Sequence, residues 1–146
     1  MANLALSDVA PKVALSPGGE TYVNALGDGT AKPGDAVGIT QADGKVVQTE
    51  IGTSELFVGF LDINVETDMD TAIVAGIPCK IIVPQSAHIY NVHIEDPATT
   101  VEGAGFSMTF SNTAGAMEGA ASAILGLARL AEDAVDTDVY GKVRWD

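Results

Sequence analysis

The sequence predicts an all-β fold: a small antiparallel β-barrel or β-sandwich, built from two similar repeats and preceded by an extended N-terminal arm. Two observations indicate this fold. From Glu20 onward, short runs of β-branched and aromatic residues alternate with turn residues at intervals of about ten residues. In addition, several glycine-centred landmarks of the first half recur in the same order in the second half.

Residues 1–19 form the predicted arm. They contain Pro11 and Pro17, end in Gly18 and Gly19, and carry apolar residues without a sustained period. Prolines and glycines at these positions disfavour both a helix and a regular strand. We therefore expect an extended segment that packs on another surface, followed by one β-barrel domain over residues 20–146.

The barrel domain consists of short segments with the composition of strands. Asp-Gly, Pro-Gly and Asp-Pro pairs mark tight turns between them, at residues 28–29, 33–34, 43–44 and 96–97. The stretch PGDAVGITQADGKVV, residues 33–47, shows the pattern as a turn, a strand, a second turn and another strand. The predicted strands are 21–25, 36–40, 45–49, 56–64, 73–75, 77–83, 88–94, 106–110, 122–131 and 139–145.

The two repeats are predicted from landmarks that lie 67 to 71 residues apart. Gly59 in VGF aligns with Gly126 in LGL, the turn glycine Gly34 aligns with Gly103, and Gly44 falls near Gly115. The first repeat then covers about 34–83 and the second about 103–145. Two such units closing on each other would remove exposed strand edges.

One segment, residues 114–134, is ambiguous on its own. It is rich in alanine and leucine, which favours a helix by propensity alone. Because its partner in the first repeat, FVGFLDINV, has the pattern of a strand, the repeat predicts a strand around Leu127.

The charge balance excludes several classes of partner. The chain has 20 acidic and 7 basic residues and a formal net charge of −13, so neither nucleic acid nor an anionic membrane is an expected partner. This excess is explained either by solubility or by a saline habitat. The single Cys79 permits no intrachain disulfide. The N-terminal residues do not have the pattern of a secretory signal, and we expect a soluble, unexported product.

The residue types that usually carry chemistry are few. His88 and His93 are five residues apart, which places them on opposite faces of a strand. They are therefore not expected to bind the same metal ion. The carboxylates at 66–70 and at 132–138 are read either as solvated turns or as a site for a hard cation. We predict no catalytic residue, no cofactor and no metal ligand.

The sequence resembles the small β-barrel decoration proteins of tailed double-stranded DNA viruses, also called cement or head-stabilising proteins. The resemblance covers nearly the whole chain. It is carried by the apolar arm, the turn KPGDAV followed by DGKV, the strand with VGF, and ILGLARLA closing on VYGKVRWD.

This resemblance implies a bacteriophage structural protein without an active site. It would bind the capsid exterior of the virion as a homotrimer, after assembly in the host cytoplasm, and stabilise contacts between major capsid protein subunits. The arm, about residues 2–17, would reach over a neighbouring subunit, and Trp145 would either join the core or anchor a neighbour. The predicted partner contacts are Leu4, Leu6, Val9, Val13, Leu15 and Trp145.

Two alternatives remain at this point. One is another structural module, such as a tail, fibre or surface-layer component. The other is a cation-binding β-barrel that uses the acidic clusters.

Overall fold

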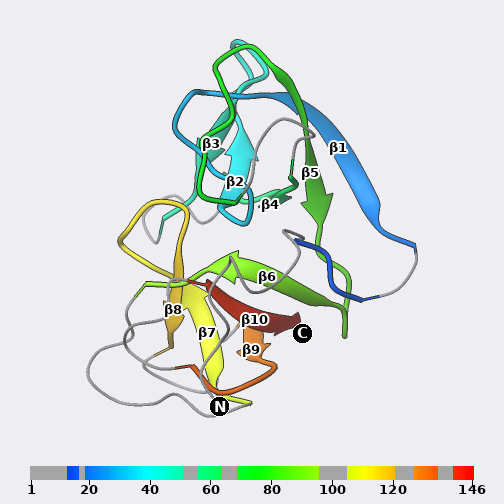
Figure 1. Ribbon diagram of the computed structural model, residues 1–146, viewed down its shortest axis with the longest axis vertical. Helices are drawn as coiled ribbons and strands as arrows, with labels where there is room; N and C mark the ends of the chain where they lie inside the picture. The colour runs from blue at the N-terminus through cyan, green and yellow to red at the C-terminus, as the bar shows by residue number, and fades with distance from the viewer. Residues whose placement is uncertain are drawn as a thin grey trace.

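The computed structural model describes residues 13–16, 19–50, 56–63, 69–95, 105–120, 127–134 and 140–146. Within these ranges the chain forms two antiparallel five-stranded sheets, which confirms the predicted all-β fold. Figure 1 shows strands β1–β5 in one half of the molecule and β6–β10 in the other. No helix in the described ranges is long and apolar enough to cross a membrane.

The first sheet has the strand order β1-β5-β4-β2-β3. A parallel bridge between Leu26 and Lys45 joins its first and last strands, so this sheet closes on itself. We call this unit the first barrel. Its strands are β1 (Thr21–Leu26), β2 (Ala36–Ile39), β3 (Val46–Gln48), β4 (Gly59–Leu61) and β5 (Pro78–Val83).

The second sheet has the order β6-β10-β9-β7-β8 and is closed in the same way by a parallel bridge between Ile94 and Met117. We call it the second barrel. Each unit therefore closes on itself, rather than on the other unit as predicted. The strands are β6 (Ile89–His93), β7 (Ser107–Phe110), β8 (Met117–Gly119), β9 (Ala128–Leu130) and β10 (Tyr140–Trp145).

The two barrels have the same topology, with β6 to β10 in the places of β1 to β5. Equivalent hydrogen bonds fix the correspondence. Gly34 donates its N–H to Leu61 O at 2.8 Å, and Gly105 donates its N–H to Leu130 O at 2.7 Å. Both glycines have positive φ, 91° and 88°, which favours glycine at this turn.

The structural correspondence differs by two residues from the predicted alignment. Gly34 corresponds to Gly105, and Gly59 corresponds to Ala128 rather than to Gly126, because these residues have the same pairing partners in β2 and β7. A shift of two residues keeps every side chain on its face of the strand, so the alternating pattern alone does not detect it.

The barrels share one apolar interface. In the first barrel, Leu61 and Ile81 belong to its interior, whereas the adjacent Phe60 and Ile82 join the core of the second barrel. Successive strand residues point to opposite faces, so β4 and β5 serve both cores. Phe60 and Ile82 are fully buried, and each contributes about 2 kcal/mol by apolar burial.

One predicted strand was wrong and one strand was missed. Residues 73–75 are not a strand: Ile73 is buried and its N–H donates to Ala31 O at 3.1 Å, so this segment is a loop packed on residues 27–31. Strand β8 was missed, because Met117–Gly119 lies among alanines and glycines that give little strand signal. The predicted strand at 122–131 is observed at β9, and residues 121–126 lie outside the described ranges.

Candidate functional site

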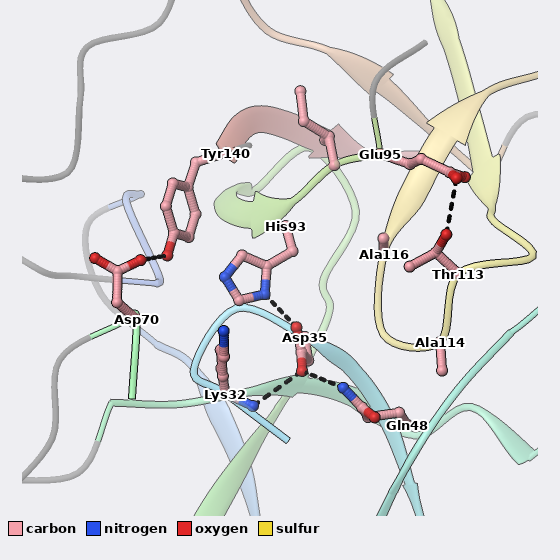
Figure 2. Close-up of a pocket in the computed structure, with 11 residues that line it drawn as sticks. Lys32, Asp35, Gln48, Asp70, His93, Glu95, Thr113, Ala114, Ala116 and Tyr140 are labelled. Carbon is pink, nitrogen blue, oxygen red and sulfur yellow. Dashed lines mark hydrogen bonds and ion pairs between the residues drawn. The ribbon is translucent and has the colours of Figure 1, made fainter. Parts of the chain in front are cut away.

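A cleft of about 350 Å³ lies between the two barrels and is shown in Figure 2. Turns and strand ends of both units supply its walls. Eight of the eleven lining residues have polar or charged side chains, which makes the cleft the candidate site for chemistry. The lining residues are Lys32, Asp35, Gln48, Asp70, His93, Ile94, Glu95, Thr113, Ala114, Ala116 and Tyr140.

Asp35 is the central carboxylate of the cleft and is only 3% exposed. It directly precedes β2, in the turn that Gly34 makes. Its Oδ2 accepts the N–H of Lys32 at 2.9 Å and Nε2 of Gln48 at 2.8 Å. Its Oδ1 is hydrogen-bonded to Nδ1 of His93 in β6. One side chain of the first barrel is thereby joined to the second barrel.

His93 connects Asp35 to a second polar pair. Because the carboxylate only accepts, Nδ1 of His93 carries the proton of their hydrogen bond. The imidazole lies against the ring of Tyr140, with centroids 4.6 Å apart. Tyr140 donates its hydroxyl hydrogen to Asp70 and is 3.0 Å from Met69 O. Figure 2 shows the other nitrogen of His93 on the side of the ring away from Asp35.

Glu95 occupies the opposite end of the cleft. Its Oε1 accepts the Thr113 hydroxyl at 2.7 Å, and Oε2 accepts the hydroxyl of Ser111. These hydrogen bonds hold the pKa of Glu95 below its usual value. Glu118, on β8, has its pKa raised by burial and then by Glu95.

The cleft therefore contains a histidine that could act as a general base, but the described residues of its lining offer no free hydroxyl for this base to activate. An imidazole oriented by a buried carboxylate is an arrangement that can accept a proton. Each of the three carboxylates lining the cleft, however, accepts a hydrogen bond from another residue of the lining. Thr113 is the only serine or threonine among the described residues of the lining, and its hydroxyl donates to Glu95. The three carboxylates, Nδ1 of His93 and the hydroxyls of Thr113 and Tyr140 are thus bonded within the cleft.

Within the described ranges, neither Cys79 nor the acidic side chains form a second site. Burial, together with Asp28, raises the pKa of the Cys79 thiol, so this cysteine is a poor nucleophile. Among the described residues, no group of three or more His, Cys, Asp and Glu side chains could hold a metal ion. Glu66, Asp68, Asp136 and Asp138 of the acidic clusters lie outside the described ranges.

Both histidines join the barrels. His88 is 2.7 Å from Glu20, and Glu20 also accepts the Tyr90 hydroxyl at 3.0 Å. Like His93 with Asp35, this pair connects β6 to a carboxylate of the first barrel. The two histidines have separate partners, so the structure does not bring them to one site.

The predicted partner contacts have different positions. Val13 is fully buried in the core of the second barrel, so in this state its side chain is not available to a partner. Leu15 is half-buried and donates its N–H to Ile89 O at 2.9 Å. Trp145 is half-buried and stacks on Phe57, with centroids 5.4 Å apart. Leu4, Leu6 and Val9 lie outside the described ranges.

Sequence reasoning missed Asp35 as an important residue. Its position in the first repeat has no carboxylate in the second, which gave it the appearance of an incidental turn residue. Its role depends on His93, 58 residues away, and no local pattern marks such a pair.

No protein-family model matches the chain, and no curated protein matches its sequence. The geometry of the cleft, the strand edges and the exposed side chains therefore carries the functional argument.

Proposed function

We propose that the chain is a non-enzymatic structural protein of a virion, which binds the outer surface of an icosahedral capsid as a homotrimer. It would stabilise contacts between major capsid protein subunits. The observation that carries this proposal is the mutual bonding of the cleft groups: Asp35, His93 and Glu95 hold the two barrels and their turns together, as a structural module requires.

An exposed apolar turn gives a second line of support. Residues 74–78, of sequence VAGIP, are all exposed, with Val74 at 64% and Ile77 at 40%. Ile77 donates its N–H to Val74 O at 3.1 Å, which closes the turn. The corresponding connection before β10 has the sequence AEDAVDTDV, so the shared topology does not demand an apolar turn here. Exposed apolar groups on an acidic protein favour a protein partner.

Attachment at many symmetric positions suits a module of this size. A single turn and a short apolar arm bury little surface, and each contact alone is weak. Three copies bound together to a repeating surface gain from effective concentration, so weak contacts become strong in sum.

Binding to undecorated capsid shells tests the proposal. Purified protein is mixed with the shells, and bound protein is measured by co-sedimentation over a range of concentrations. We expect saturation at a fixed ratio to the major capsid protein. Absence of saturable binding, with shells that are intact by electron microscopy, would refute the proposal.

Variants of the exposed turn sharpen this test. V74S/I77S changes two exposed side chains and should weaken shell binding at least tenfold, which is about 1.4 kcal/mol. T30A, in the adjacent exposed loop, is the matched control and should bind as wild type does. Equal binding by V74S/I77S and T30A would remove the turn from the interface.

The arm is tested by a deletion that spares the core. Removal of residues 2–17 would also remove Val13, which is fully buried, and would confuse loss of contact with loss of folding. Deletion of residues 2–12 avoids this, and we expect it to weaken shell binding while the far-ultraviolet circular dichroism stays unchanged.

A further inference from the structure

In the second barrel, residues 13–16 pair with the outer edge of β6 through an isolated bridge between Ala14 and Tyr90. Asn91 donates its N–H to Val13 O at 2.7 Å, and Leu15 donates its N–H to Ile89 O at 2.9 Å. The Ile89 N–H donates to the hydroxyl of Ser16 at 2.8 Å. Residues 13–16 thereby cover backbone groups that β6 would otherwise expose.

The first barrel has the same edge at β1, which takes the place of β6. Leu26 donates its N–H to Gly44 O and not to β5, so Tyr22 and Asn24, at alternate positions, direct their backbone groups to that same side. Within the part of the chain that the structure describes, no backbone segment pairs with Tyr22 or Asn24 on this side.

The exposure of the two edges differs accordingly. Asn91, whose N–H is bonded to Val13, is 7% exposed, whereas Asn24, its counterpart in β1, is exposed. Tyr22 is 45% exposed, and Nζ of Lys80 lies 5.5 Å from its ring centroid. An open edge beside an exposed aromatic ring is a site for strand addition.

The sequence contains a second copy of the segment that covers β6. Residues 13–16 read VALS, and residues 4–7 read LALS. The first copy therefore has the same alternation, with an aliphatic residue, alanine, leucine and serine in order. Every group that residues 13–16 use on β6, two backbone positions and a serine hydroxyl, is present in residues 4–7.

We propose that residues 4–7 of a neighbouring copy of this chain add to the open edge of β1. The pairing repeats the one on β6. Asn24 donates its N–H to Leu4 O, Leu6 donates its N–H to Tyr22 O, and the Tyr22 N–H donates to the hydroxyl of Ser7. Leu6 then lies beside Tyr22 and covers its exposed ring.

The direction of the chain favours a neighbouring copy as the source. Residues 13–16 run antiparallel to β6, with Val13 at Asn91 and Leu15 at Ile89, so Val13 is the end of this segment nearer His93. The edge of β1 begins near Glu20, which is bonded to His88 at the other end of β6. A segment of the same chain would have to reverse its direction within residues 8–12 to reach that edge.

Charge also favours this segment. Residues 1–7 have no ionisable side chain, in a chain whose formal net charge is −13. Burial, Asp62 and Glu20 raise the pKa of Tyr22, which shows that carboxylates border the edge. An uncharged strand can approach this border on another acidic copy without repulsion between side chains.

This inference rests on the proposed function in one respect only, the expectation that three copies of the chain associate. A segment of each copy bound to the next is a head-to-tail contact, which closes into a ring when the rotation permits. The pairing is tested without capsid shells, so its failure and the failure of capsid binding are separate results.

Disulfide trapping tests the register. Ala14 is the bridge partner of Tyr90, between the two backbone hydrogen bonds, so Ala5 would face Val23 where side chains come closest. In a C79A background, A5C/V23C should give covalent dimers and trimers on non-reducing gels, with a disulfide-linked peptide joining positions 5 and 23. A10C/V23C is the matched control and should stay monomeric on the same gel.

A variant of the edge gives an independent measurement. N24P removes one outward N–H and should abolish the trimer in analytical ultracentrifugation, whereas N24A retains this N–H and should remain trimeric. A disulfide within a single chain, or no disulfide in A5C/V23C, would overturn the proposal. A trimer that persists in a folded N24P variant would overturn it as well.

Discussion

Removal of the Asp35 carboxylate should destabilise the protein more than any other single change to the cleft. The carboxylate accepts three hydrogen bonds and is 3% exposed. Hydrogen bonds to a charged group contribute about 1.5 to 3 kcal/mol each. Two of the donors, on Gln48 and His93, are half-buried and can find water in the variant. We therefore expect D35A to lose about 3 to 4 kcal/mol, which is less than the sum of about 4.5 to 9 kcal/mol for three such hydrogen bonds.

The assay is equilibrium unfolding in urea, followed by tryptophan fluorescence and circular dichroism. D35A should lower the midpoint, and D35N should fall between D35A and wild type because its amide oxygen still accepts. Asp43 provides the control within the same hairpin. It accepts the N–H of Lys45 at 3.1 Å in an exposed turn, so D43A should leave the midpoint close to that of wild type.

A double-mutant cycle isolates the connection between the barrels. If Asp35 acts through His93, then D35A, H93A and the double variant should show a coupling of about 1 to 2 kcal/mol. Loss of less than about 1 kcal/mol in D35A, or additivity in the cycle, would refute the role given to this pair.

Three further predictions concern stability. In G59A the new Cβ would lie 2.0 Å from the carbonyl oxygen of Ile82, so we expect this variant not to fold when it is expressed and measured by circular dichroism. G44A is the control: Gly44 has φ +72° but open space around its Cβ position, so G44A should fold. Burial raises the pKa of Tyr90 from 10.0 to about 12, which favours the neutral phenol in the folded state. The contribution of Tyr90 to folding stability is therefore present below pH 10 and lost between about pH 10 and 12. Y90F should lack this loss of stability in an alkaline unfolding titration. The pKa of Glu95 is lowered in the folded protein, so the contribution of Glu95 to folding stability is present above the unfolded-state pKa of 4.5 and is lost in acid. E95Q should flatten the acid side of the profile of stability against pH. An unchanged profile would contradict this.

The sequence predicted those parts of the fold that local chemistry determines. The hairpin at residues 33–47 is observed as β2 and β3, because Gly44 supplies a positive φ and β-branched residues flank the turn. Strands β1, β5, β6, β7 and β10 lie within two residues of their predicted bounds. Gly115, predicted near Gly44 in the repeat, also has positive φ and lies between β7 and β8.

Long-range features were beyond local patterns. The bond between Asp35 and His93 joins two units whose relative position no spacing reveals. The self-closure of each barrel depends on single parallel bridges, such as Leu26 with Lys45. The coverage of β6 by residues 13–16 depends on a pairing across more than seventy residues, although the tetrapeptide VALS and its copy LALS were visible in the sequence.

We propose that this chain attaches to the outside of a viral shell. Electron cryomicroscopy of undecorated shells mixed with the purified protein tests it most directly. We expect added density at repeated symmetric positions on the capsid exterior, into which three copies of the two-barrel fold can be placed. Shells whose averaged surface is unchanged at saturating protein would contradict it.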